Sequence, residues 1–108
     1  MTITSHHRLP AQPTRPAGTD AAALRAGVYQ EFLYGVGAAP GLDLGRALRY
    51  TKDGGVFRQE FELGLTLANA GDVPVEVVLD RAYDDAEGAR RTRLTLFPHC
   101  AEVLRLPA

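Results

Sequence analysis

The stretch VFRQEFELGLTLAN, residues 56–69, constrains the fold more than any other part of the sequence. Large apolar residues occupy most of its odd positions, whereas its even positions are largely charged or small. This alternation is typical of a β-strand with one dry and one wet face, because successive side chains on a strand point to opposite faces. Gly64 interrupts the run and indicates a bend, a bulge or a close backbone approach. We therefore predict one long strand, or two strands joined at Gly64, with a single apolar face.

Short segments of the same kind fill residues 46–108, with turn signals between them. ALRY precedes the dipeptide Asp53-Gly54, which is a strong hairpin signal. VPVEVVL and TRLTLF alternate again, and VLRL lies near the end of the sequence. About six or seven short strands at this spacing predict an all-β fold, a small antiparallel β-sandwich. The predicted core residues are Phe57, Phe61, Leu63, Leu65, Leu67, Val73, Val75, Val77, Leu79, Leu94, Leu96, Leu104 and Leu106.

Residues 1–18 form a predicted disordered tail. They contain Pro10, Pro13 and Pro16 and few apolar side chains, so they cannot bury enough surface to offset the entropy of ordering. His6 and His7 lie in this tail without a nearby carboxylate or thiol, which favours solvation over metal binding.

Residues 19–45 are predicted to contain a short helix and an aromatic connecting segment. Thr19 is a suitable N-cap and Gly27 a suitable C-terminal cap for a helix of about two turns. Residues 28–36 are rich in aromatic side chains, and we predict a strand there, followed by an irregular connection.

The composition sets limits on function. A chain of 108 residues is enough for one domain, and its net charge of -1 gives no support to a nucleic-acid partner. No apolar run reaches the length of a membrane span, and the first residues lack the apolar middle of a signal peptide, so we expect a cytoplasmic location by default. Cys100 is the only cysteine, and its apolar neighbours favour a packed thiol over a reactive one. No cofactor is expected.

Two groups of acidic residues are the candidates for hydrolytic chemistry. Glu60 and Glu62 would lie about 7 Å apart on one strand face, a spacing that suits two catalytic carboxyl groups. That face, however, is the one predicted to meet water beside Arg58, so a solvated ion pair is the preferred interpretation. Asp84, Asp85 and Glu87 belong to a polar loop and are expected to serve its turn; a small hydrolase is therefore the least favoured hypothesis.

The spacing aromatic-Arg-x-x-Phe-Glu-x-Gly, followed by Leu-x-Asn and a Val-rich strand, resembles the C-terminal β-sandwich domain of TIM-barrel (alpha-amylase-like) glycoside hydrolases. The family usually has a proline where this chain has Ala70, and a chain of this length cannot hold the catalytic barrel. The resemblance implies a non-catalytic accessory domain with a packing role, whose partner would be a catalytic barrel domain or a second copy of itself. The residues that carry the motif are Phe57, Arg58, Phe61, Glu62, Gly64 and Asn69.

A free-standing glycan- or protein-binding module is the alternative. Sugar rings stack on exposed aromatic side chains, and tryptophan is absent, so the candidates for glycan contact are Tyr29, Tyr34, Tyr50 and Tyr83.

Three motif residues have predicted structural roles. Glu62 is expected to pair with Arg58 or with an arginine of a neighbouring strand. Gly64 is expected to leave room for a close crossing. Asn69 is expected to cap the following turn through its side chain.

Overall fold

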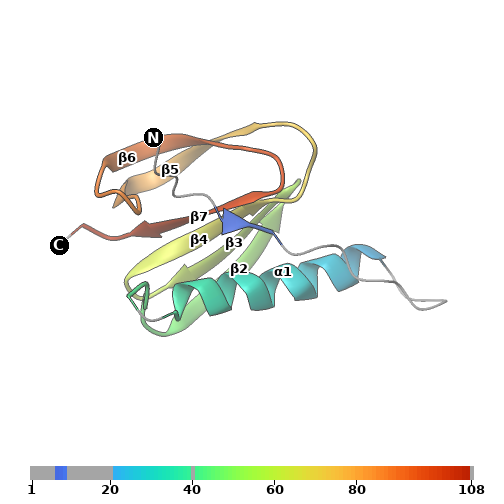
Figure 1. Ribbon diagram of the computed structural model, residues 1–108, viewed down its shortest axis with the longest axis horizontal. Helices are drawn as coiled ribbons and strands as arrows, with labels where there is room; N and C mark the ends of the chain where they lie inside the picture. Colours follow the sequence, from blue (N-terminus) through green and yellow to red (C-terminus); the bar gives the residue numbers. More distant parts are fainter. Residues whose placement is uncertain (1–6, 10–20, 40, 108) are drawn as a thin grey trace.

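The computed structural model describes residues 7–9, 21–39 and 41–107. Most of these residues lie in antiparallel strands and one helix packs against them, so the predicted all-β, sandwich-like fold is confirmed (Figure 1). Within the described residues, no helix has both the length and the apolar character needed to cross a membrane. The elements in chain order are β1 (His7–Arg8), α1 (Ala21–Gly37), β2 (Ala47–Asp53), β3 (Val56–Phe61), β4 (Gly64–Asn69), β5 (Val75–Asp84), β6 (Arg90–Leu96) and β7 (Cys100–Arg105).

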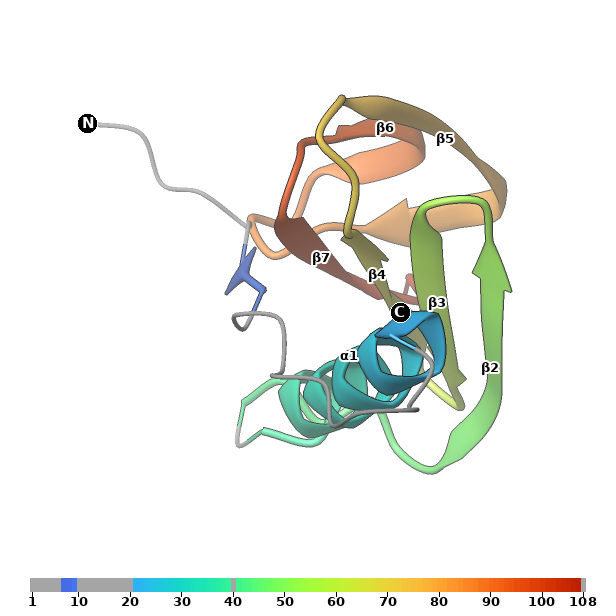
Figure 2. The ribbon, with the colours of Figure 1, turned by 90° about the vertical axis from the view of Figure 1, so that its right-hand side faces the viewer.

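The strands form layers, with α1 on one side of the central strands and the β5–β6 hairpin on the other. The strand order is β2-β3-β4-β7-β5-β6, and β1 adds to β7. Among the described residues, β5 pairs with β7 at Asp84 opposite Arg105 and nowhere else, so the β5–β6 hairpin turns away from the other strands and folds over them (Figure 2). Leucines of β4 and β7 pack there against leucines of β5 and β6.

The stretch over residues 56–69 forms a tight hairpin, so the prediction of a single apolar face is wrong. Glu62 and Leu63 make a two-residue connection, and Phe61 lies opposite Gly64. Because directly opposed residues share a face, an odd-numbered residue of β3 and an even-numbered residue of β4 point to the same side.

On each face of this hairpin, the residues of one strand therefore have odd numbers and those of the other strand have even numbers. Phe57 lies opposite Ala68, and both are buried beneath α1. Leu65 and Leu67 face the other way, into the aliphatic core beneath β5 and β6. All 6 residues of β4 are buried, since a layer covers the strand on either side.

The aromatic segment at residues 28–36 is helical, and the prediction of a strand there is also wrong. Helix α1 continues through Gly27, the predicted cap, where a Cβ would meet nothing within 4 Å. Tyr29 and Leu33 are four residues apart, so they share a helix face, and both are fully buried against the sheet. Burial of this face overrides the preference of aromatic residues for strands. Thr19 lies outside the described residues.

Part of the predicted tail is placed against the sheet. His7 and Arg8 pair with β7 as the short strand β1, and Leu9 packs into the cluster beneath α1. The other residues of the segment 1–18, including His6, lie outside the described residues.

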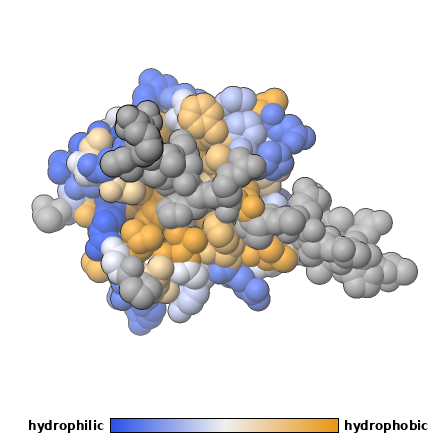
Figure 3. Space-filling model, in the orientation of Figure 1, coloured by the Kyte–Doolittle hydropathy of each residue, from blue (hydrophilic) through white to orange (hydrophobic). Residues whose placement is uncertain are grey.

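Most of the predicted core is confirmed, with two exceptions. Leu63 and Val73 are 50% and 65% exposed, because they lie in the β3–β4 turn and the β4–β5 loop. On the side seen in Figure 3, apolar side chains also gather along the seam between α1 and the sheet. The buried members of the predicted core are Phe57, Phe61, Leu65, Leu67, Leu79, Leu96 and Leu104, while Val75, Val77, Leu94 and Leu106 are half-buried.

Candidate functional site

The predicted motif residues lie on both faces of the sheet and in the turn, so they do not converge on one site. Phe57 and Phe61 pack beneath α1. Arg58 faces the opposite side, where its guanidinium lies 3.6 Å from Asp80 of β5. These three side chains thus contribute to packing and ion pairs within the chain.

The close approach predicted at Gly64 is confirmed. Gly64 lies opposite Arg105 of β7. A Cβ at position 64 would collide with the carbonyl oxygen of Leu104 and would lie 3.0 Å from the Cα of Arg105. Gly64 is not one of the glycines with positive φ, so the position requires the absence of a side chain rather than backbone freedom.

Asn69 caps the turn as predicted, and it also joins two further segments. Its Oδ1 accepts a hydrogen bond from the N–H of Gly71 at 2.9 Å. Its Nδ2 donates to the carbonyls of Val73 and Leu96 at 2.7 and 2.9 Å. The carbonyl of Asn69 accepts from the N–H of His99 at 2.8 Å. This fully buried side chain thus connects β4 to the β4–β5 loop and to the end of β6.

Glu62 pairs with an arginine beside the neighbouring strand, which is one of its two predicted partners. Its Oε1 accepts the backbone N–H of Arg46 at 2.8 Å, and the Arg46 guanidinium lies 3.9 Å from Oε2. The contacts fasten the β3–β4 turn to the chain as it enters β2.

Glu60 and Glu62 do not form an opposed catalytic pair. Glu60 stays on β3, where its Oε2 lies 2.8 Å from Arg49 and 3.2 Å from Arg58. Glu62 lies in the turn and points to Arg46. The two carboxylates thus point to different partners and do not face each other across a cleft. The predicted ion-pair role of Glu60 therefore accounts for its contacts.

The acidic loop between β5 and β6 is organised by Asp85, which is buried. Its Oδ1 accepts hydrogen bonds from the N–H groups of Glu87 and Ala89, both at 2.9 Å, and its Oδ2 lies 3.0 Å from Arg91 Nε. Burial alone raises the pKa of Asp85, but the hydrogen bonds from Ala89, Arg91 and Glu87 outweigh it and leave this pKa below its usual value. These contacts agree with the predicted turn role.

The four tyrosines predicted as glycan contacts separate into two kinds. Tyr29 and Tyr83 are 1% and 5% exposed, so they belong to the core and cannot receive a sugar. Tyr34 is 51% exposed on α1, and Tyr50 is half-buried on β2. The structure brings these two together at one cleft.

The α1–β2 cleft, with a volume of about 570 Å³, opens between the helix and the edge strand. Tyr50 stacks on Phe57, with ring centroids 6.4 Å apart and planes at 25°. The ring centroids of Tyr34 and Phe61 lie 5.9 Å apart. Both tyrosines are therefore held by buried aromatic rings. The cleft is lined by Gln30, Glu31, Tyr34, Ala47, Leu48, Arg49, Tyr50 and Gln59.

Polar groups complete the cleft. Gln59 is 3% exposed, and its Nε2 donates to the carbonyls of Arg49 and Glu60 at 3.1 and 3.3 Å, which fixes its amide. Burial raises the pKa of Tyr50 above its ordinary value of 10.0. The sequence signal for these lining residues was the four-residue spacing of Gln30 and Tyr34, which shows only once residues 28–36 are taken as a helix.

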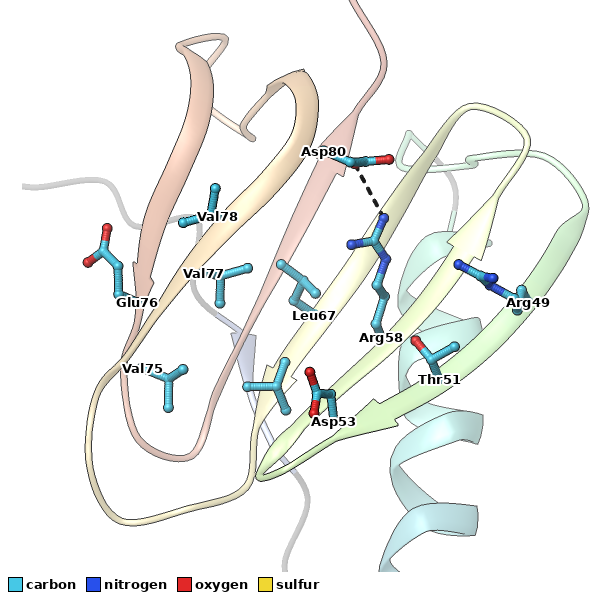
Figure 4. Close-up of a pocket in the computed structure, with 11 residues that line it drawn as sticks. Arg49, Thr51, Asp53, Arg58, Leu67, Val75, Glu76, Val77, Val78 and Asp80 are labelled. Atoms are coloured by element: carbon cyan, nitrogen blue, oxygen red, sulfur yellow. Dashed lines mark ion pairs between the residues drawn. The ribbon is translucent and has the colours of Figure 1, made fainter.

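A second hollow, of about 510 Å³, lies on the opposite face of β2 and β3, toward β5 (Figure 4). Arg58 stands at its centre, and a dashed line in the figure marks its ion pair with Asp80. Arg58 Nε is buried and has no aligned hydrogen bond among the described residues, although Glu60 Oε2 lies 3.2 Å away. Arg49 and Glu76 add charges of both signs to the rim. The charges in this hollow already compensate one another, so it favours an ion-pair network over a ligand site.

Histidine and cysteine do not assemble a metal site in the part of the chain that the structure describes, where no group of three or more potential ligands occurs. His99 Nε2 instead lies 2.8 Å from Asp72 Oδ1, between the two loops that Asn69 also joins. Cys100 is half-buried at the start of β7.

Comparison with protein-family models, curated proteins and solved structures finds no match to this chain. The resemblance to glycoside hydrolase C-terminal domains therefore depends on the motif residues alone and stays a prediction.

Proposed function

We propose that this protein is a non-catalytic accessory domain that acts by binding, and that the α1–β2 cleft is its binding site. The observation that supports the proposal is that Tyr34 and Tyr50 both line this cleft, beside the fixed amide of Gln59. The volume of the cleft is typical of sites for small ligands.

An oligosaccharide is the ligand class that suits the cleft best. The faces of sugar rings carry C–H groups that pack on tyrosine rings, and their hydroxyls need both donors and acceptors. Glu31 supplies acceptors, and Gln30 supplies both donors and acceptors. The resemblance to C-terminal domains of glycoside hydrolases agrees with a carbohydrate-related role.

Support of a larger neighbour, such as a catalytic barrel domain, is the second candidate. It is favoured by the exposure of Leu48 and Tyr34, 55% and 51%, on the lip of the same cleft. Apolar side chains in such positions are characteristic of surfaces that contact another protein domain.

The test is a titration with α- and β-linked gluco-oligosaccharides, followed through the amide and aromatic resonances of the protein. We expect shifts that centre on the cleft, and we expect Tyr34→Ala to weaken binding roughly tenfold, since one stacking platform is lost. Phe97→Ala removes an aromatic ring that is 47% exposed outside the cleft, so it serves as the matched control and should bind as the parent does. Unchanged resonances at millimolar sugar would reject the glycan and favour the support role.

A further inference from the structure

We infer that this protein forms a symmetric homodimer by antiparallel pairing of β2 with β2 of a second copy, with the two-fold axis at Thr51. The inference does not depend on the ligand proposed for the cleft. It follows from the position of β2 in the sheet and from the order of charges along the strand.

Strand β2 is an edge whose pairing among the described residues is satisfied on one side only. It pairs with β3, and it stands at the end of the strand order. Figure 2 places it at one rim of the molecule. An edge strand of this kind presents backbone N–H and C=O groups that another strand can use.

The regular part of β2 runs over residues 49–53, after an irregularity between Ala47 and Arg49. A two-fold axis perpendicular to the sheet leaves equivalent residues on the same face in both copies. Opposed residues must then have numbers of the same parity, because side chains alternate between the faces. The axis must therefore pass beside a residue, and Thr51 is the central one.

With the axis at Thr51, every charged residue of this segment meets a favourable partner. Arg49 lies opposite Asp53 of the second copy, and the same pair recurs on the other side of the axis. Arg49, Thr51 and Asp53 line the same hollow, so these ion pairs share one face of the sheet. The Arg49 side chain is 68% exposed, and its bond to Glu60 uses one of five N–H donors.

The opposite face is complementary as well. Lys52 lies over its own Phe57, with Nζ 5.7 Å from the ring centroid, and Tyr50 stacks on the same ring. In the proposed dimer, Lys52 of the second copy lies opposite Tyr50, where its ammonium group would meet the tyrosine ring. Neighbouring axes are less favourable: at Lys52 the two lysines would oppose each other, and at Tyr50 the arginine–aspartate pairs would be lost.

The other edge of the sheet, β6, lacks this complementarity. Its sequence, Arg90–Leu96, carries three arginines and no acidic residue. Axes at residues 91, 92 or 93 would all place arginine opposite arginine, which is unfavourable. The acidic partners of these arginines, such as Glu76 with Arg93, lie within the same chain. Self-association is therefore expected at β2 and not at β6.

Pairing through β2 has a consequence for the cleft. Because the two-fold axis is perpendicular to the sheet, the α1-covered faces of both copies lie on the same side. Both α1 helices would therefore cover one side of a continuous sheet. Two α1–β2 clefts would then flank the junction, and Lys52 of each copy would approach Tyr50 of the other.

The experiment is sedimentation equilibrium of the full chain at low salt, over concentrations from about 10 μM to about 1 mM, because a five-residue strand pair is a small interface. We expect a reversible monomer–dimer equilibrium. Asp53→Arg and Arg49→Asp should each raise its dissociation constant about tenfold, since two attractive pairs become repulsive. The double variant Asp53→Arg/Arg49→Asp should restore the parent value, because it re-creates both pairs in reverse.

Glu87→Arg makes the same change of charge as Asp53→Arg in the loop after β5, so it should leave the dissociation constant unchanged. Circular dichroism of each variant checks that the monomer is folded. A chain that stays monomeric throughout would overturn the inference, as would a dimer unaffected by either single reversal. Failure of the double variant to recover, with both single variants folded, would reject the register at Thr51.

Discussion

Helix α1 covers its face of the sheet mainly with rings and methyl groups, whereas the β5–β6 hairpin on the opposite face is also held by directional polar contacts. Under α1, Tyr29 meets Phe57 edge to face, with centroids 5.1 Å apart and planes at 73°. The hydroxyl of Thr66 donates to the carbonyl of Leu33 over a long 3.3 Å. The helix is therefore positioned by the fit of apolar side chains, which is not directional.

The hairpin face has an aliphatic core and a polar anchor. Leu65, Leu67 and Leu104 pack there against residues of β5 and β6. At one end of this core, the buried side chain of Asn69 makes three hydrogen bonds of 2.7 to 2.9 Å. Directional bonds of this kind fix one arrangement of the hairpin, because each donor left unpaired in the core would cost free energy.

The difference between the two faces of the sheet affects where a ligand can bind. The seam between α1 and β2 is held mainly by aromatic contacts, which can adjust to a bound molecule while the buried amide of Gln59 stays in place. The hairpin face lacks this freedom. We therefore expect binding to occur on the helix side and the hairpin side to set the stability of the fold.

Gly64→Val is the largest test of this division, because Gly64 lies where β4 and β7 meet and both layers depend on those strands. The new side chain would collide with backbone at Leu104, which cannot move without parting the strands. We expect a loss of about 4 kcal/mol or more in the free energy of unfolding, or no folded protein. Chemical denaturation followed by circular dichroism measures it.

Gly35→Ala is the matched control. Gly35 lies inside α1 with nothing within 4 Å of a Cβ, so alanine should stabilise the chain by about 0.5–1 kcal/mol through its helix propensity. If the Gly64→Val variant unfolds at the same denaturant concentration as the parent, the close contact at Gly64 is disproved.

The roles of Gly64 and Asn69 could be predicted because glycine in a strand and asparagine before a turn each have few physical uses. The reversal of faces at Glu62 and Leu63 could not, because these residues carry no turn signature. Their turn is held by distant backbone groups: the N–H of Leu63 donates to Leu44, at 2.7 Å, and the carbonyl of Leu63 accepts from Leu106, at 2.8 Å. A local sequence pattern cannot report such contacts.

The cleft was predictable only in part. Tyr34 and Tyr50 were among the four candidate tyrosines, but Tyr29 and Tyr83 are chemically identical to them. Which tyrosine faces water depends on which side of α1 packs on the sheet and on which strands β5 packs against. Neither follows from composition. The positions of Tyr29 and Leu33, four residues apart, carried the helical signal within a segment of mixed propensity.

Asn69→Ala and Thr66→Val compare polar side chains on the two faces of the same strand. Asn69→Ala would leave the carbonyls of Val73 and Leu96 without their donor, and we expect a loss of about 3 kcal/mol. Thr66→Val preserves the shape of a side chain whose one hydrogen bond to α1 is long, so its cost should stay below about 1 kcal/mol. Urea unfolding of both variants measures the difference. Equal losses would show that the two faces are held alike.

Acid should loosen the β5–β6 hairpin before α1, because Asp85 holds the loop of this hairpin. This is the smallest of the effects that we predict. Its pKa in the folded chain lies below the ordinary 3.8, chiefly because hydrogen bonds to Ala89, Arg91 and Glu87 overcome the opposing effect of burial. The stabilisation is therefore complete above about pH 5 and is lost as pH falls through 3.8 toward the lower folded value. Asp85→Asn should cost about 1 kcal/mol at pH 7 and nearly nothing at pH 2. Amide exchange at pH 3 should speed up in β5 and β6 more than in α1. A parallel decline of parent and variant between about pH 5 and 2 would assign the acid sensitivity to other carboxylates.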